Sequence, residues 1–366
     1  MGFVVGVVGG VGAMKLVYDA SAPPWGVLAF VLGLAAAVVV HELGHLIAGW
    51  TVGFHFNSIQ VGWFFIGFEY GKLTFKTKYQ SNLAGYATIR IDRIRRLRTR
   101  LLIFILGGPA ANLFGALISA GIVTVFDSEN SRIASFASVF ALICLMLTFL
   151  NLMPFSTRGM RTDGGRIRML LASRDNTRRW ICLMAIGRQW QDGKAPKYWN
   201  GNWTKTAASI RDSSYDEYAS CWASYIRASG RKDVDVAARC LERCLEISSM
   251  LPGNLRDLLF LEASIFTAWF RRDAVRAGRW ALQIRNPNSF PKLLWLRGLI
   301  ALDCAKGDFP SARSEWEQAK RLIERLPRTK YREGLLTAFD EWLMEIKDRE
   351  RETSSRVQVV GADVQG

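Results

Sequence analysis

The sequence is poor in histidine, and its cysteines form no pattern that would hold a metal or a disulfide framework. Only three histidines occur among 366 residues, and the six cysteines include no Cys-x-x-Cys pair. Cys240 and Cys244 fall one helical turn apart, but no histidine or further cysteine lies near them in the sequence. Zinc ribbons and secreted disulfide scaffolds are therefore excluded, and we expect free, buried thiols in a reducing compartment.

Acidic residues are in the minority, with 32 Asp and Glu against 48 Lys and Arg, so the formal net charge is +16. Such an excess would suit a nucleic-acid-binding protein if it lined a groove. Here many of the basic residues cluster beside apolar runs, in residues 72–100 and 158–179. This placement is typical of the cytoplasmic flanks of membrane helices, so we expect no nucleic-acid partner.

Long apolar runs occupy the first part of the chain and are missing from the second. Residues 26–49 contain Glu42 as their only charged residue, and residues 101–126 and 133–155 contain none. Each run is long enough for a helix that crosses a bilayer. The shorter, glycine-rich run 3–18 is either a further span or an interfacial segment, and we take a span as the prediction.

Between the first two clean runs the pattern changes from continuously apolar to partly alternating. Residues 58–91 are rich in Val, Ile, Phe, Tyr and Thr and are interrupted by glycines. This pattern predicts short β-strands, which would form either a surface hairpin domain or an insert associated with the membrane.

The distribution of basic residues predicts the orientation in the membrane. The loop 51–100 and the segment after residue 155 are basic, whereas the short links 19–25 and 127–132 carry acidic residues and at most one base. Basic loops stay in the cytoplasm, so the loop 51–100 and the chain beyond residue 155 should be cytoplasmic.

The chemistry is concentrated in His41-Glu42-Leu43-Gly44-His45, which lies inside the first apolar run. On a helix, His41 and His45 are one turn apart and face the same side, as two nitrogen ligands of one tetrahedral Zn²⁺ must. Glu42 is then placed to take a proton from a zinc-activated water. A purely structural cluster is disfavoured, because ionisable groups inside an apolar span are costly and are usually functional.

Two histidines leave one protein ligand to be found. A metzincin-type site would have a third histidine at position 51, which is Thr51, so a carboxylate must serve. The membrane-proximal carboxylates are Glu69, Asp92, Asp127, Glu129 and Asp163. The predicted orientation puts Asp127 and Glu129 at the wrong face and returns Asp163 to the right depth, while Glu69 and Asp92 remain open. His55 lies beyond the span and is expected to be interfacial.

Three segments together resemble the site-2 protease family of intramembrane zinc metalloproteases, over about residues 26–170. They are His41–His45, Gly107–Asn112, and Asn151–Pro154 with the following Asp163-Gly164. The resemblance implies one zinc ion per chain, held by His41, His45 and Asp163, with Glu42 as catalytic acid and base.

The same resemblance assigns further roles and shows one departure. It implies that Asn151 positions substrate or stabilises the oxyanion, and that the β-rich segment pairs with an unwound substrate strand. Eight residues separate Pro154 from Asp163, where about four are usual in the family, so we expect an inserted loop at the membrane edge.

The remainder of the chain is polar and reads as helical. We expect a Trp-rich amphipathic connector over 166–212, with Arg178 and Arg179 among lipid head groups, and a disordered tail over 351–366. Ala238, Ala277 and Ala312 each follow the start of a second helix, 39 and 35 residues apart, which resembles the spacing of tetratricopeptide hairpins. Residues 213–350 would then be helical repeats that bind a protein partner, with an irregular helical bundle as the alternative.

The predicted fold is therefore mainly α: a transmembrane helical core over 1–165 with a short β-rich insert, followed by a soluble helical repeat domain. The predicted function is intramembrane zinc endopeptidase, acting on transmembrane protein substrates within membrane lipid. The expected location is a bacterial inner or cell membrane, spanned several times, with the C-terminal domain cytoplasmic. The alternatives are a membrane-anchored zincin that cuts soluble proteins, and a non-catalytic helical-repeat scaffold on a membrane anchor.

Overall fold

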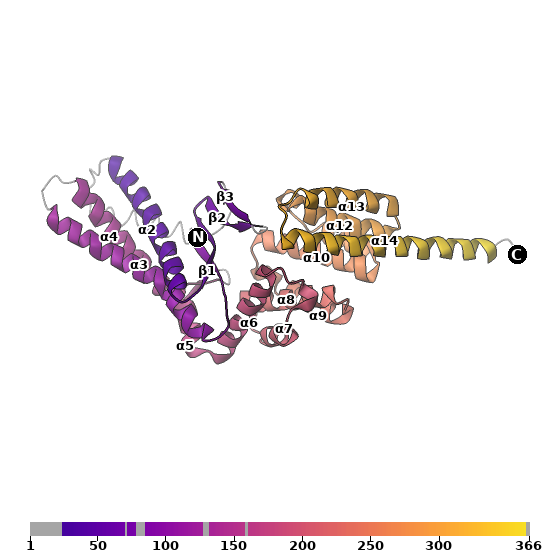
Figure 1. Cartoon of the computed structure of the whole chain (residues 1–366), viewed down its shortest axis with the longest axis horizontal. Helices are drawn as coiled ribbons and strands as arrows, with labels where there is room; N and C mark the ends of the chain where they lie inside the picture. The colour runs from indigo at the N-terminus through magenta and orange to yellow at the C-terminus, as the bar shows by residue number, and fades with distance from the viewer. Residues whose placement is uncertain (1–23, 70–71, 78–84, 127–131, 158–159, 364–366) are drawn as a thin grey trace. The chain divides into compact units, whose positions relative to one another are not determined.

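The computed structural model describes residues 24–69, 72–77, 85–126, 132–157 and 160–363. The chain divides into two compact units, Met1–Arg188 and Gln189–Gly366 (Figure 1). The described part is mainly helical, as predicted, with a four-stranded antiparallel sheet and a two-stranded hairpin in the first unit. The predicted span 3–18 lies outside the described residues.

Three helices of the first unit are long and apolar enough to cross a membrane. They are α2 (Pro24–Thr51), α3 (Leu97–Val125) and α4 (Arg132–Leu152). They confirm the apolar runs 26–49, 101–126 and 133–155 as helices. Helix α3 begins at Leu97, four residues before the apolar run, so its first turn includes Arg98 and Arg100.

Small residues allow α2 and α3 to cross with their backbones in contact. A Cβ atom on Gly44 would lie 2.4 Å from the Gly107 carbonyl oxygen, and a Cβ on Gly107 would lie 2.5 Å from Ala48 Cβ. No residue larger than glycine fits at either position without moving a helix. This contact fixes the His41–His45 segment of α2 against the middle of α3.

The β-rich segment folds into a four-stranded antiparallel sheet with the order β3-β2-β1-β4. The strands are β1 (His55–Val61), β2 (Phe64–Glu69), β3 (Lys72–Lys76) and β4 (Gly85–Arg90). One face of β2 and β3 is apolar and exposed, with Phe64, Ile66, Phe68, Leu73 and Phe75. Edge strand β4 lies against α2, so the sheet reaches the helix that carries His41 and His45.

Arg100 fixes the C-terminal end of α2 and the end of β4 to the start of α3. Its buried guanidinium donates hydrogen bonds to the carbonyl oxygens of Val52 (2.7 Å), Gly53 (3.1 Å) and Arg93 (2.7 Å). It also forms an ion pair with Asp92. Burial raises the pKa of the Asp92 carboxyl, but the contacts with Arg100 outweigh this effect and lower it overall.

Helices α5 (Asp163–Ala172) and α6 (Arg174–Gln191) close the first unit. The expectation that Arg179 lies among lipid head groups is wrong, because its side chain is fully buried and donates a 2.8 Å hydrogen bond to Asn176 Oδ1. The apolar face of α6, with Trp180 and Ile186, is buried in the protein. An amphipathic pattern shows that one face is covered, but it does not distinguish protein from lipid.

The second unit consists of helices joined by short turns. Its α-helices are α7 (Gly201–Ala208), α8 (Tyr215–Gly230), α9 (Val234–Glu246), α10 (Gly253–Arg271), α11 (Ala274–Ala281), α12 (Lys292–Lys306), α13 (Phe309–Glu324) and α14 (Lys330–Asp363). Three short 3₁₀ helices cover Pro196–Tyr198, Ser248–Met250 and Pro287–Ser289. Helices α8 and α9, α10 and α11, and α12 and α13 pack as successive hairpins.

The predicted start of each second helix is confirmed. Asp233, Asp273 and Asp308 cap α9, α11 and α13, and each accepts a hydrogen bond from the backbone N–H three residues later. Four or five residues after these aspartates lie Ala238, Ala277 and Ala312, which are buried where the paired helices meet. The assignment of these hairpins to tetratricopeptide repeats remains a prediction.

The cysteines are as the sequence predicts. All six are free thiols, and all but the half-buried Cys240 are buried.

The C-terminal tail was expected to be disordered from residue 351, but α14 continues to Asp363. The helix is anchored earlier, where Phe339 and Ile346 are buried.

Candidate metal centre

Helix α2 and the start of α5 bring His41, His45 and Asp163 together. His41 Nε2 lies 3.1 Å from Asp163 Oδ2, His45 Nε2 lies 3.4 Å from the same oxygen, and the two Nε2 atoms are 3.2 Å apart. His41 and His45 are each only 6% exposed. One ligand atom from each residue lies within 4.8 Å of the others, so the three could hold one ion.

The hydrogen bond on the far side of His45 indicates which ring nitrogen is free to bind a metal. His45 Nδ1 lies 2.8 Å from the backbone oxygen of Phe104. Gly108 N also lies 3.3 Å from Nδ1, but the contact with the carbonyl oxygen is shorter. A carbonyl oxygen can only accept, so this contact favours the tautomer with the proton on Nδ1, in which Nε2 presents its lone pair to the cluster. This carbonyl–histidine arrangement orients metal-ligating imidazoles in known metal sites.

Asn112, on α3, occupies the corresponding position behind His41. Its side-chain amide lies 3.2 Å from His41 Nδ1. The residue is fully buried, and its Oδ1 finds no hydrogen-bond partner among the described residues. Amide nitrogen and oxygen are interchangeable by a 180° rotation. That rotation would place Oδ1 against Nδ1, where it would accept the proton that His41 carries when its Nε2 binds a metal.

We therefore expect Asn112→Leu to lower zinc affinity by about 10- to 100-fold, because the support of His41 is lost. Asn112→Asp should retain affinity, since a carboxylate also accepts from Nδ1. Competition with a calibrated chelator on the purified protein measures both. Ser119→Ala, which changes another buried polar residue of α3, is the matched control. Equal zinc affinity in Asn112→Leu and wild type would remove Asn112 from the site.

Gly108 leaves the space that the cluster needs. A Cβ atom at this position would lie 2.5 Å from His45 Nε2 and 2.8 Å from His41 Nε2. The proposed ligand atoms are thus directed at the bare backbone of α3, with no side chain between. The following Pro109 lies inside α3 and has no backbone N–H, so it leaves the Ile105 carbonyl without its usual helical partner.

Asp163 reaches the cluster despite the longer connection after Pro154. The additional residues form a small hairpin of β5 (Ser156–Thr157) and β6 (Met160–Arg161). Thr162 closes its base: its hydroxyl donates to the Met153 carbonyl oxygen at 2.6 Å and accepts from Gly165 N at 3.2 Å as the cap of α5. The two paired strands return the chain to the end of α4, so Asp163 lies next to it.

Gly164 and the histidines hold the Asp163 carboxylate in place. A Cβ atom on Gly164 would come 1.8 Å from the Leu152 carbonyl oxygen, so only glycine allows α5 to start this close to α4. Burial alone would raise the pKa of the Asp163 carboxyl, but hydrogen bonds with His41 and His45 outweigh it and lower the pKa to about 2. The group is therefore an anion at neutral pH.

Glu42 lies between this cluster and strand β4. Its side chain is 7% exposed and interacts electrostatically with His45 and Asp163. Its carboxylate accepts a hydrogen bond from the Ala87 N–H, and a Cβ atom on Gly85 would lie 2.9 Å from Glu42 Oε1. The edge of β4 that does not pair with β1 thus faces the glutamate.

The other predicted residues lie elsewhere or are otherwise engaged. Asn151 donates its side-chain amide to the Leu147 carbonyl oxygen at 3.0 Å, within its own helix. Asp92 is paired with Arg100, His55 is exposed at the start of β1, and Glu69 ends β2. Asp127 and Glu129 are outside the described residues. Sequence reasoning assigned no metal-site role to Phe104, Gly108 or Asn112, whose importance depends on contacts between helices.

The donor set fits a zinc ion. Two imidazole nitrogens and one carboxylate oxygen converge, both histidines have a hydrogen-bonding group behind them, and a fourth position is left for water or substrate, as in catalytic zinc sites.

Three apolar helices of membrane-spanning length indicate a membrane protein, and His41, His45 and Asp163 form a cluster that could hold a metal ion. Residues 29–128, which are 100 of the 366 residues, match the family model described as peptidase family M50. This segment is therefore similar to the site-2 protease family of membrane metallopeptidases. No curated protein and no solved structure matches the chain. The matched segment contains His41, Glu42 and His45 but ends before Asp163, so the position of Asp163 rests on the geometry.

Proposed function

We propose that this chain is an intramembrane zinc endopeptidase of the site-2 protease type, which hydrolyses peptide bonds in or near transmembrane segments of membrane proteins. The observation that supports it most is the convergence of His41, His45 and Asp163 beside Glu42, inside helices long enough to cross a bilayer. A soluble-substrate zincin would need its motif helix outside the apolar spans, whereas here the motif lies within α2.

In this proposal one zinc ion per chain is held by His41, His45 and Asp163. The ion supplies a Lewis acid that polarises the scissile carbonyl and acidifies a bound water. Glu42 accepts the proton of the attacking water and passes it to the leaving amine. The hydrogen bond that Glu42 accepts from the Ala87 N–H keeps its carboxylate beside the cluster. Because the site is buried, bulk water is largely excluded from it.

The substrate would bind as a strand along the free edge of β4. Backbone groups of an unwound substrate segment can pair with that edge, which is β-augmentation, and this would place a peptide bond next to Glu42. The exposed apolar face of β2 and β3 would contact membrane lipid. Asn151 would position the substrate only after its amide leaves the Leu147 carbonyl oxygen.

The remaining parts of the proposal concern location and the second unit. We propose that the protein lies in a bacterial inner or cell membrane, with the basic loops and the second unit in the cytoplasm, because cytoplasmic loops are rich in Lys and Arg. The helical hairpins would act as tetratricopeptide-like repeats that recruit a protein partner.

Removal of metal tests the proposal directly. The purified protein is reconstituted in phospholipid vesicles with a single-span model substrate that carries a label on each side of its membrane segment. We expect cleavage within or next to that segment, a fall of more than about 100-fold after chelation, and recovery when zinc is restored. Casein, an unfolded soluble protein, serves as the comparison substrate.

Each outcome separates the alternatives. Cleavage of casein with the membrane substrate intact would indicate a membrane-anchored zincin. Absence of cleavage in both, with zinc bound, would favour the scaffold function, provided that a panel of different spans has been tested. Cleavage that persists after chelation, with zinc shown to be absent, would contradict the metal mechanism.

A further inference from the structure

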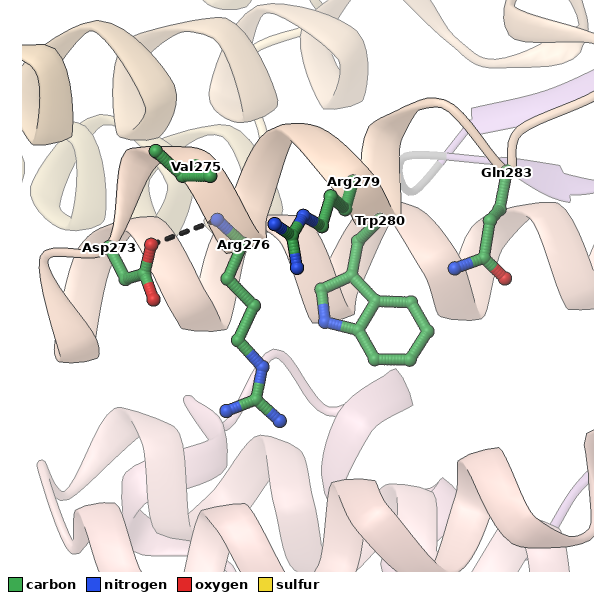
Figure 2. A pocket seen from close by; sticks show the side chains of 6 residues that line it. All are labelled: Asp273, Val275, Arg276, Arg279, Trp280 and Gln283. Atoms are coloured by element: carbon green, nitrogen blue, oxygen red, sulfur yellow. Dashed lines mark hydrogen bonds between the residues drawn. The ribbon is translucent and has the colours of Figure 1, made fainter.

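The second unit carries an arginine- and tryptophan-lined pocket on one face of α11. The pocket has a volume of about 410 Å³ and is lined by Asp273, Val275, Arg276, Arg279, Trp280 and Gln283. Figure 2 shows these side chains along the helix. Arg276, Arg279 and Trp280 have the i, i+3, i+4 spacing of a single helix face, and Gln283 follows in the turn after α11. By helix rise the lining extends about 15 Å, the length of roughly five residues of extended peptide.

The positive charge of this pocket is not neutralised by the protein. Arg276 and Arg279 are exposed, and neither forms an ion pair with any residue that the structure describes. The only acid of the lining, Asp273, accepts a 2.8 Å hydrogen bond from Arg276 N as the helix cap. By contrast, Arg243 of α9 is paired with Glu217, and Arg313 of α13 is paired with Glu350.

Trp280 gives the same pocket an apolar floor. Its ring stacks on Phe260 of α10, with centroids 6.0 Å apart and planes 20° apart, and packs against the core of helices α8 to α10. The ring is half-buried, so it is held rigidly while part of its surface remains open. Val275, which is 70% exposed, adds an apolar contact. Tryptophan and arginine are the residues that most often dominate binding energy at protein interfaces.

We propose that this face of α11 is the docking site for an extended acidic peptide segment of a protein partner. Carboxylates of the segment pair with Arg276 and Arg279, and an apolar side chain between them lies on Trp280. The unpaired charge of Arg276 and Arg279 selects an acidic partner, and the length of the lining suits a short extended segment. The proposal concerns the second unit alone and does not depend on peptidase activity.

Binding of labelled peptides to the full chain in detergent tests this proposal. The probe is a hexapeptide of alternating Glu and Leu, and the comparison peptide has Gln in place of Glu. Fluorescence anisotropy should show the acidic peptide binding at least about tenfold more tightly, with the difference shrinking as salt is raised. The double variant R276E/R279E should lose at least about tenfold in affinity for the acidic peptide.

A second double variant controls for net charge. Arg239 and Arg325 are exposed on α9 and at the end of α13, and R239E/R325E makes the same change in charge away from the pocket. It should bind the acidic peptide within about twofold of wild type, and Trp280→Ala should weaken both peptides. Unchanged circular dichroism shows that each variant is folded.

Three results would overturn the proposal. The first is equal affinity for the acidic and neutral peptides, and the second is an equal loss in both double variants. The third is peptide binding that is weak in every protein while R276E/R279E abolishes binding to phosphatidylserine vesicles. That last result would assign the face to an anionic lipid surface instead.

Discussion

Replacement of Glu42 by glutamine is expected to abolish peptide cleavage while zinc content stays near one ion per chain. The substitution keeps the size of the side chain and an oxygen that can accept from the Ala87 N–H, so the packing around it should persist. What disappears is the ability to take a proton from the attacking water. Loss of a general base lowers rates by about 10² to 10⁴-fold.

Cleavage of the reconstituted model substrate and zinc content, measured on the same preparation, check this expectation. Glu242→Gln makes the same chemical change at an exposed position of α9 and should leave both quantities unaltered. Glu42→Asp should give low but measurable activity, since the carboxylate is retained but set back by one methylene. Full activity in Glu42→Gln would show that another group is the base, and the proposed role of Glu42 would be abandoned.

The elements that could be predicted from the sequence are those with a local signature. Twenty or more consecutive apolar residues predict a spanning helix, and His41 and His45 must share a face wherever the helix forms. The alternation after residue 58 predicted strands, and the recurrence of Ala238, Ala277 and Ala312 predicted the starts of the second helices. These signals depend on residues near one another in the chain, so tertiary packing was not needed to read them.

The parts that could not be predicted depend on contacts between distant segments. Nothing near Phe104 or Asn112 in the sequence indicates that they lie behind the two histidines, 59 and 71 residues away. The glycine at 108 could be read as ordinary helix packing, whereas a Cβ there would meet both imidazoles. The free edge of β4 beside Glu42 likewise follows from strand order, which alternation does not reveal.

The inserted hairpin after Pro154 shows why spacing alone left the third ligand open. A loop that is four residues longer could have moved Asp163 several ångströms. Instead, the backbone pairing of Ser156 with Arg161 and the Thr162 cap return the chain to its starting point. A hairpin that closes at its base changes the count of residues without changing where the next residue lies.

Asp163→Ala is therefore expected to lose most of the bound zinc, although the aspartate is remote in sequence from His41 and His45. It removes one of three converging donors and the only anionic one, and two buried imidazoles bind zinc far more weakly than a complete site. Metal analysis of the detergent-purified protein should show about one zinc per chain in wild type and little in the variant.

Two further variants separate ligand loss from misfolding. Asp175→Ala changes an exposed acid twelve residues along the chain, in the first turn of α6, and should retain zinc. Asp163→Cys should recover part of the metal, because a thiolate also ligates zinc, whereas a variant that merely failed to fold would not be rescued. Zinc fully retained in Asp163→Ala would move the third ligand elsewhere. Asp92 is committed to Arg100, so Glu69 at the end of β2 would be tested next, and the hairpin after Pro154 would then have no role in holding a ligand.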